Sequence, residues 1–215
     1  MRPLTTAQPA HRVLDHPLAG HHLAVLRDRR SGPEQFRAAA RRLSVLLAVE
    51  AARTLPVRTG AVDTPLAAAP VATVVAWPLL VPILRAGAGL LDGVLDIVPG
   101  APVAFVGLRR DETSLRAACY ADTIPAALDG AAVWILDPMV ATGGSLAAAA
   151  GMAAARGAGP ALALCVLAAP EGLARLADEA PGLTVICAAV DDRLDDRGFI
   201  VPGLGDAGDR LYGTL

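Results

Sequence analysis

One segment of the chain combines an acid, two glycines and two hydroxyl side chains immediately before an alanine-rich stretch. It reads Asp137, Pro138, Met139, Val140, Ala141, Thr142, Gly143, Gly144, Ser145. The glycines allow neighbouring backbone N–H groups to point toward one site, and Thr142 and Ser145 add hydroxyl donors. A helix that begins here would add free N–H groups and the positive end of its dipole. The segment therefore predicts a cradle for one phosphate, although an ordinary strand-to-helix turn with a serine cap would use the same residues.

The position of the acid narrows the choice of ligand. Asp137 stands ahead of the glycines, where a carboxylate would contact a sugar hydroxyl or a developing cation. The chain has no lysine, so the segment is not a P-loop. A monophosphate that carries a ribose fits these residues better than a triphosphate.

Two other segments place arginine directly after an apolar stretch. Arg85 follows Leu79–Leu84, and Arg109-Arg110-Asp111-Glu112 follows Pro102–Leu108. An arginine at the carboxyl end of a strand, beside small residues, can bind a diphosphate through its planar guanidinium. A surface salt bridge at Arg85, and a solvated charged loop at residues 109–112, are the alternatives that the sequence leaves open.

The segment Gly198–Asp209 holds four glycines and one proline. So many glycines permit close approaches of the backbone to a ligand or to another segment. A glycine-rich surface loop is the alternative, but a purely structural loop has little need for them.

Short apolar runs alternate with small-residue helical stretches from Leu79 onward, which predicts a parallel sheet with helices on both faces. We expect the strands at Leu79–Leu84, Pro102–Leu108, Ala132–Leu136, Ala161–Leu167 and Leu183–Ala188, and helices at Gly87–Ile97, Ser145–Arg156 and Glu171–Glu179. An earlier helix should begin at a Ser31 cap and end near Arg53, and residues 55–69 should form a loop or a hairpin. Ligands of such folds bind at the carboxyl ends of the strands, where the segments described above begin.

Composition excludes several classes of protein. The chain has 215 residues, of which 54% are hydrophobic, and its mean hydropathy is +0.48, so it is not disordered. A net charge of −2 and few aromatic residues argue against a nucleic-acid partner. Residues 64–84 are uncharged but contain four prolines, which would break a membrane helix. The three cysteines, odd in number, predict buried free thiols in a cytoplasmic protein.

These motifs together resemble the uracil phosphoribosyltransferases, a branch of the type I phosphoribosyltransferases. Residues Ile135 to Ser145 are similar to the loop that binds 5-phosphoribosyl 1-diphosphate (PRPP), with Pro138 where the wider fold usually has a second acid. Further similarity lies in Val81–Gly87, Ala168–Gly172 and, most specifically, Gly198–Asp209. The resemblance implies a single α/β domain over residues 1–215, with a parallel sheet flanked by helices and a small hood built from the N-terminal and C-terminal segments.

The resemblance also implies an activity, in which uracil and PRPP give UMP and diphosphate in pyrimidine salvage. Asp137 and Arg110 would be catalytic. PRPP would contact Arg85, Arg110, residues Asp137 to Ser145 (that is, Asp137, Pro138, Met139, Val140, Ala141, Thr142, Gly143, Gly144 and Ser145) and Asp206. The backbone of Ile200, Gly205, Asp206 and Ala207 would read uracil.

The resemblance further implies Mg²⁺ held mainly by substrate oxygens, GTP as an effector and a homo-oligomer. The four histidines lie near the N-terminus without a carboxylate cluster, so no metal site of the protein's own is expected. A different class remains open, namely a PRPP-sensing regulatory protein on the same fold with little turnover. The charged loop at residues 109–123, which departs from the family pattern, favours that alternative, whereas the Gly198–Asp209 segment argues against it.

Overall fold

The computed structural model describes residues 11–110 and 117–214. Its helices are α1 (Pro17–Arg27), α2 (Pro33–Ala52), α3 (Ala88–Ile97), α4 (Gly144–Ala154), α5 (Pro170–Glu179) and α6 (Ala207–Tyr212). Its strands are β1 (His11–Val13), β2 (Val57–Asp63), β3 (Ala68–Val74), β4 (Leu79–Leu84), β5 (Val106–Arg110), β6 (Ala117–Asp122), β7 (Val133–Leu136), β8 (Met139–Val140), β9 (Ala161–Ala168), β10 (Leu183–Val190), β11 (Arg193–Leu194) and β12 (Ile200–Val201).

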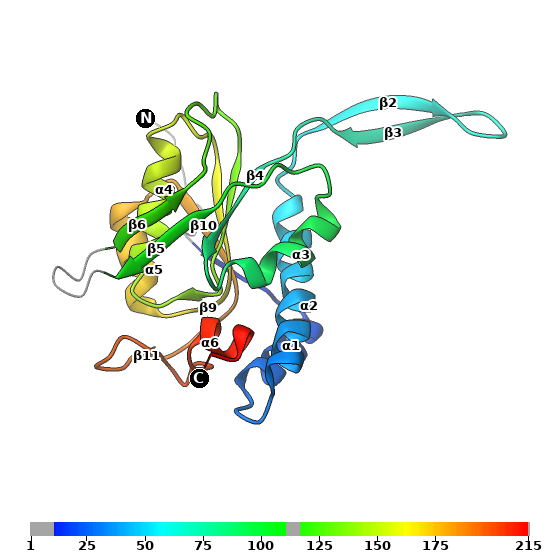
Figure 1. The fold of residues 1–215 in the computed structure, drawn as a ribbon. Coiled ribbons are helices and arrows are strands. Elements are labelled where there is room, and N and C mark those ends of the chain that lie inside the picture. The colour runs from blue at the N-terminus through cyan, green and yellow to red at the C-terminus, as the bar shows by residue number, and fades with distance from the viewer. Residues whose placement is uncertain (1–10, 111–116, 215) are drawn as a thin grey trace, which may run out of the picture.

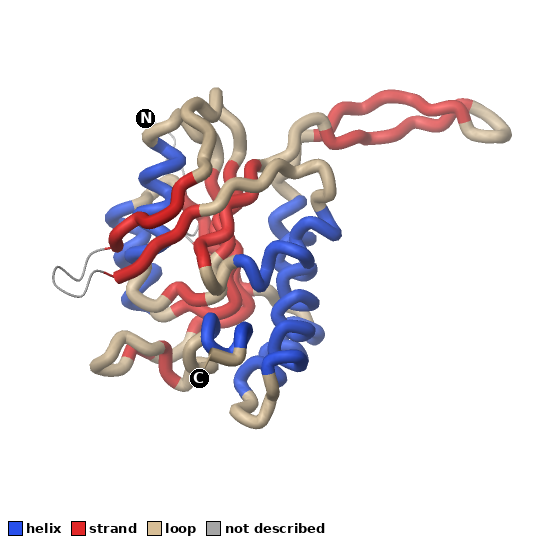
Figure 2. Tube along the Cα trace, viewed as in Figure 1, coloured by secondary structure: helices blue, strands red, loops and turns tan. Residues whose placement is uncertain are grey.

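The main sheet has the strand order β1-β10-β9-β7-β4-β5-β6, and β8 also pairs with β9. Every neighbouring pair from β1 to β5 is parallel, and β6 closes the edge antiparallel to β5. The sheet lies between two groups of helices, as Figure 1 and Figure 2 show. The expected α/β fold is confirmed.

Alternating side chains of the buried strands feed two hydrophobic cores. Leu162, Leu164 and Val166 of β9 pack on the side of α1, α2 and α3, where Phe36, Leu43 and Leu47 are also buried. The residues between them, Ala163 and Cys165, pack on the side of α4 and α5. A strand that is buried on both faces reads as a continuous apolar run, which is why the sequence revealed these strands clearly.

The element boundaries agree with the sequence predictions to within a few residues. Three local features differ, of which two are boundaries and one is the exposure of a cysteine. The cap of α2 is Gly32 rather than Ser31, and the Gly32 N–H donates to the Gln35 side chain at 3.2 Å. The strand expected at Pro102–Leu108 begins at Val106. Cys119 is exposed on β6, whereas Cys165 and Cys187 are buried as expected.

The β2–β3 hairpin projects away from the rest of the chain (Figure 1). Its strands pair antiparallel from Val57↔Val74 to Asp63↔Ala68. Every residue of β2 is exposed, and Leu66 in the connecting turn is 96% exposed. Residues 64–84 are thus the end of a hairpin followed by a central strand, and among the described residues no helix is long and apolar enough to cross a membrane.

Candidate functional site

Parallel pairing of β4 with β7 brings the first two predicted segments together. Pro82 lies opposite Leu136 in the register, so the chain leaves both strands at the same edge of the sheet. Gly87, in the turn after β4, contacts the end of β7 so closely that a Cβ atom there would lie 2.2 Å from the Leu136 carbonyl oxygen. Arg85 and Asp137 therefore leave adjacent strand ends.

The segment from Asp137 to Ser145 has the strand, turn and helix that a phosphate cradle requires. Met139 and Val140 form β8, which pairs with the end of β9, and the chain then turns into α4. Gly143 caps this helix with a φ of +76°, a left-handed conformation that favours glycine. The first N–H groups of a helix have no acceptor within the helix, so the start of α4 presents donors where the sequence predicted them.

Close packing from behind fixes the position of this turn. A Cβ atom on Gly143 would lie 2.7 Å from the carbonyl oxygen of Gly172, and one on Gly172 would lie 2.3 Å from that of Ala141. Gly172 belongs to α5, so α5 backs the turn without any intervening side chain. In the sequence, the segment Ala168–Gly172 was only a weak signal for this support.

Asp137 is partly buried and lies just before this turn. Among the described residues, the one hydrogen bond to the Asp137 side chain is long and comes from the Met139 N–H, which lies 3.5 Å from Oδ1. Burial raises the pKa of Asp137 to about 7, and the Met139 N–H opposes that rise. The residue keeps partial solvent exposure, so a ligand at the site can reach its carboxyl group.

The side chain of Arg85 is exposed and points toward the C-terminal segment. Its Nη2 atom lies 3.3 Å from Asp209 Oδ1, and its side chain is 59% exposed. The Tyr212 hydroxyl donates to the Arg85 carbonyl at 3.0 Å. An exposed ion pair of this length contributes little to stability, so Arg85 is available to an anion.

The glycine-rich segment predicted at Gly198–Asp209 folds over the phosphate turn. A Cβ atom on Gly198 would lie 3.7 Å from Thr142 Cγ2. Ile200 and Ala207 bury their side chains, whereas Gly205 and Asp206 are exposed. Asp206 caps α6 by accepting from the Asp209 N–H at 2.9 Å. Residues from three distant parts of the sequence therefore meet at one edge of the sheet.

Comparison with known proteins identifies this arrangement. The sequence model of the uracil phosphoribosyltransferase family matches residues 13–214. The uracil phosphoribosyltransferase of Kineococcus radiotolerans is 52% identical over an alignment of 207 residues that covers 94% of this chain and 98% of that protein. The enzyme of that name from Thermus thermophilus is 47% identical with the same coverage.

The chain belongs to the uracil phosphoribosyltransferase family.

Solved structures show a similar fold. The AQ2163 protein from Aquifex aeolicus is 36% identical, with a TM-score of 0.88 over 94% of this chain and 97% of that one. The adenine phosphoribosyltransferase of Leishmania donovani, at 14% identity and a TM-score of 0.57 over 90% of this chain and 89% of that one, shares the fold. The type I phosphoribosyltransferase fold expected from the sequence is thus confirmed.

The structure places most of the predicted site residues of this uracil phosphoribosyltransferase family member at one edge. Arg85, Asp206 and the turn ahead of α4 lie there together. Arg110 ends β5 at the same edge of the sheet, but residues 111–116 lie outside the described part of the chain and the side chain of Arg110 is not described. Its catalytic role stays a prediction. Asp209, the partner of Arg85, was missed because its signal was only its place in the C-terminal motif.

We predict that Gly143→Ala weakens binding of PRPP, the ligand expected from the sequence, by about tenfold or more, because lost hydrogen bonds to a charged group cost about 1.5–3 kcal/mol. The substitution places a Cβ atom against the Gly172 carbonyl at a positive φ. Isothermal titration calorimetry with PRPP measures the effect. Gly130→Ala is the matched control, since Gly130 has a φ of +80° with nothing within 4 Å of its Cβ position. Equal PRPP affinities in the two variants would refute the cradle.

A second prediction concerns the pH dependence of stability. The pKa of Asp137 in the folded state lies above its usual value of 3.8, at about 7. The native state therefore holds this proton more tightly than the unfolded state, and stability is lost as pH rises through that interval. Relative to Asp137→Asn, the wild type should lose on the order of 2–4 kcal/mol of unfolding free energy between pH 4.5 and pH 7.5. Parallel curves in urea titrations across this range would contradict the raised pKa.

Proposed function

We infer that this chain transfers the phosphoribosyl group of PRPP to uracil, giving UMP and diphosphate. The observation that carries the inference is the family match over residues 13–214, on a structure that joins the phosphate turn to the glycine-rich segment. The two relatives compared above are named for this activity, and the match covers 98% of each of them.

The reaction forms a bond between N1 of uracil and C1 of the ribose while the bond from C1 to the diphosphate oxygen breaks. The N1 proton is released, and positive charge develops on the ribose as diphosphate departs. We propose that the turn at residues 139–145 binds the 5-phosphate through backbone N–H groups and hydroxyls. Arg85 would bind the departing diphosphate, and Arg110 would add a second guanidinium.

Asp137 would act on the ribose side. A carboxyl group whose pKa lies near 7 exchanges its proton readily at neutral pH. An approaching positive centre favours its charged form, so the carboxylate would offset the charge that forms on the sugar.

We propose that the main chain at Ile200 and at Gly205 to Ala207 reads the base. Uracil presents two carbonyl acceptors on either side of an N–H donor. Main-chain groups match this edge without side chains. Ile200 and Ala207 bury their side chains, and we expect their peptide groups to face the base.

Magnesium is the metal that a diphosphate leaving group implies. Asp206 and Asp209 place carboxylate oxygens beside Arg85, and oxygen ligands of this kind suit the ion. Within the described residues no group of three or more candidate metal ligands gathers, so substrate oxygens and water would supply most of its coordination. When bound, Mg²⁺ would neutralise charge on the diphosphate.

The proposal is tested by measuring kcat/KM with PRPP and Mg²⁺ for uracil, cytosine, hypoxanthine and guanine. Cytosine has a donor where uracil has one of its acceptors, and an acceptor where uracil has its central N–H donor. The main-chain wall, formed by the peptide groups of Ile200 and Gly205 to Ala207, cannot exchange its donors and acceptors by rotation. We expect uracil to be favoured by roughly 10⁴ to 10⁵. A rate for cytosine or a purine within about tenfold of uracil would refute the main-chain wall. PRPP binding without turnover would instead support a regulatory protein, for which the relatives give no support.

Two further proposals concern an effector, which the family resemblance implies, and the location, which the cysteines indicate. GTP as an effector is tested by repeating the uracil assay with and without GTP. A cytoplasmic location agrees with Cys165 and Cys187, which lie opposite one another on β9 and β10 and are both free thiols. Free thiols persist in reducing compartments.

We also propose that the protein is a homo-oligomer, and that the β2–β3 hairpin contacts a second copy. An isolated two-stranded hairpin is at best marginally stable in water, yet this one projects from the body with Val57, Val62 and Leu66 exposed. A neighbouring subunit would cover these side chains. Each chain has a mass of 21.9 kDa.

The wild type should therefore elute as a dimer or larger species in size-exclusion chromatography with light scattering. The double substitution Val62→Glu and Leu66→Glu should lower the molar mass toward one chain, because the new charges resist burial. Substitution of Val13, which is exposed on β1, by Glu provides the control. A monomeric wild type at micromolar concentration would refute this proposal.

A further inference from the structure

The segment that would read uracil has little regular structure to hold it. After the two residues of β12, the chain passes through Pro202, Gly203, Leu204 and Gly205 before Asp206 caps α6. Gly203 and Gly205 both have positive φ. A main-chain wall discriminates between bases only as well as its peptide groups are fixed in position. Side chains must therefore supply that constraint from behind.

Both main-chain polar groups of Gly203 are bound by one ion pair. The Gly203 N–H donates to Asp191 Oδ2 at 2.8 Å, and the Gly203 carbonyl accepts from Arg27 Nη1 at 2.9 Å. The same Nη1 donates to Asp191 Oδ2 at 2.8 Å, and Arg27 Nη2 donates to Asp191 Oδ1 at 2.5 Å. The carboxylate thus binds the peptide unit before Gly203, and the guanidinium binds the peptide unit after it.

This ion pair connects the loop to the rigid part of the fold. Asp191 directly follows β10, and its N–H donates to the Ala168 carbonyl at the end of β9 at 2.8 Å. The Asp191 side chain is only 5% exposed, and Arg27 is the last residue of α1. Burial alone would raise the pKa of Asp191, but the hydrogen bonds from Arg27 and Gly203 lower it below its usual value. The Asp191 carboxylate is therefore charged where it binds Arg27 and the Gly203 N–H.

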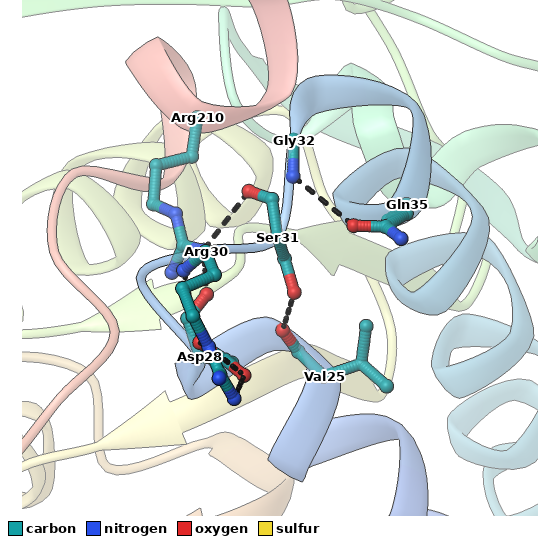
Figure 3. A network of polar contacts seen from close by, with 7 residues as sticks. All are labelled: Val25, Asp28, Arg30, Ser31, Gly32, Gln35 and Arg210. Atoms are coloured by element: carbon teal, nitrogen blue, oxygen red, sulfur yellow. Dashed lines mark hydrogen bonds and ion pairs between the residues drawn. The ribbon is translucent and has the colours of Figure 1, made fainter.

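A second arginine binds the next carbonyl along the loop. Arg210 Nη1 donates to the Leu204 carbonyl at 2.8 Å and also to the Leu26 carbonyl. Its Nη2 donates to the Asp28 carbonyl at 2.6 Å, and its guanidinium lies over the Phe36 ring. Figure 3 shows Arg210 against the turn between α1 and α2. Two successive carbonyls of the loop are thus tied to the C-terminal end of α1.

We propose that Arg27 and Asp191 are positioning residues for uracil, because they fix the two peptide units that flank Gly203 and with them the main chain that reads the base. Neither side chain needs to touch the substrate. The proposal rests on the proposed function. It predicts a defect confined to uracil binding and base selectivity, since the phosphate turn is supported separately by α5.

The principal test is Arg27→Lys, which keeps the charge. A lysine ammonium cannot hold both carboxylate oxygens and the Gly203 carbonyl in the same geometry. We expect KM for uracil to rise by about tenfold to a hundredfold, whereas kcat and the KM for PRPP change by less than about twofold. The ratio of kcat/KM for uracil over cytosine should also fall.

The matched control is Arg156→Lys. Arg156 forms a bidentate ion pair with Asp122 at the opposite edge of the sheet, and its side chain is 26% exposed, against 27% for Arg27. This variant should lose a similar amount of stability with unchanged kinetics. If KM rises equally for uracil and PRPP, or if the control behaves like Arg27→Lys, the positioning role is wrong.

Amide hydrogen exchange of the wild type keeps the proposal testable if Arg27→Lys does not fold. The Gly203 N–H should be protected in the absence of substrate, and exchange at the unprotected rate would overturn the proposal. Asp191→Asn, which keeps one oxygen for that N–H, is judged by the same kinetic criteria. A wild type that fails to convert uracil at all would refute the proposed function. An active wild type with an unaffected Arg27→Lys would refute only this inference.

Discussion

The contact between the turn after β4 and the end of β7 is the constraint on which the site depends. Gly87 lies so close to the Leu136 carbonyl that no side chain fits between them. Parallel pairing sets the direction of both strands, and this contact sets how near their outgoing loops approach. Arg85 and Asp137 are consequently held at one edge, although more than fifty positions separate them in the sequence.

The two halves of the site are supported in different ways. The phosphate turn is held by backbone packing, with Gly143 and Gly172 allowing α5 to lie directly behind it. The segment opposite it is held by charged side chains, in which Arg27, Asp191 and Arg210 bind successive peptide groups of the loop. A phosphate needs a dense set of N–H donors, whereas a base needs donors and acceptors at fixed positions. Each mode of support suits the ligand that is proposed for it.

Charge is distributed unevenly over this edge. Arg85 is exposed and weakly paired, so its guanidinium is free to meet an anion. Burial raises the pKa of Asp137 to about 7. The arrangement offers a positive group where diphosphate would leave and an ionisable acid where positive charge would form. Such a difference between neighbouring groups is typical of sites that perform chemistry.

Local pattern was enough to predict the central strands and the helices between them, since buried parallel strands read as apolar runs and their carboxyl ends carry the polar motifs. It was also enough to propose the cradle at residues 137–145, because a phosphate turn is built from contiguous residues. It left residues 55–69 undecided, and Figure 1 shows a projecting hairpin there, whose exposed strands carry no burial pattern. The sequence could not reveal the pairing of Arg27 with Asp191 and Gly203, which spans more than 160 positions. Which distant side chains meet a peptide group is decided by the packing of α1 against the end of the sheet, and only the tertiary structure shows that packing.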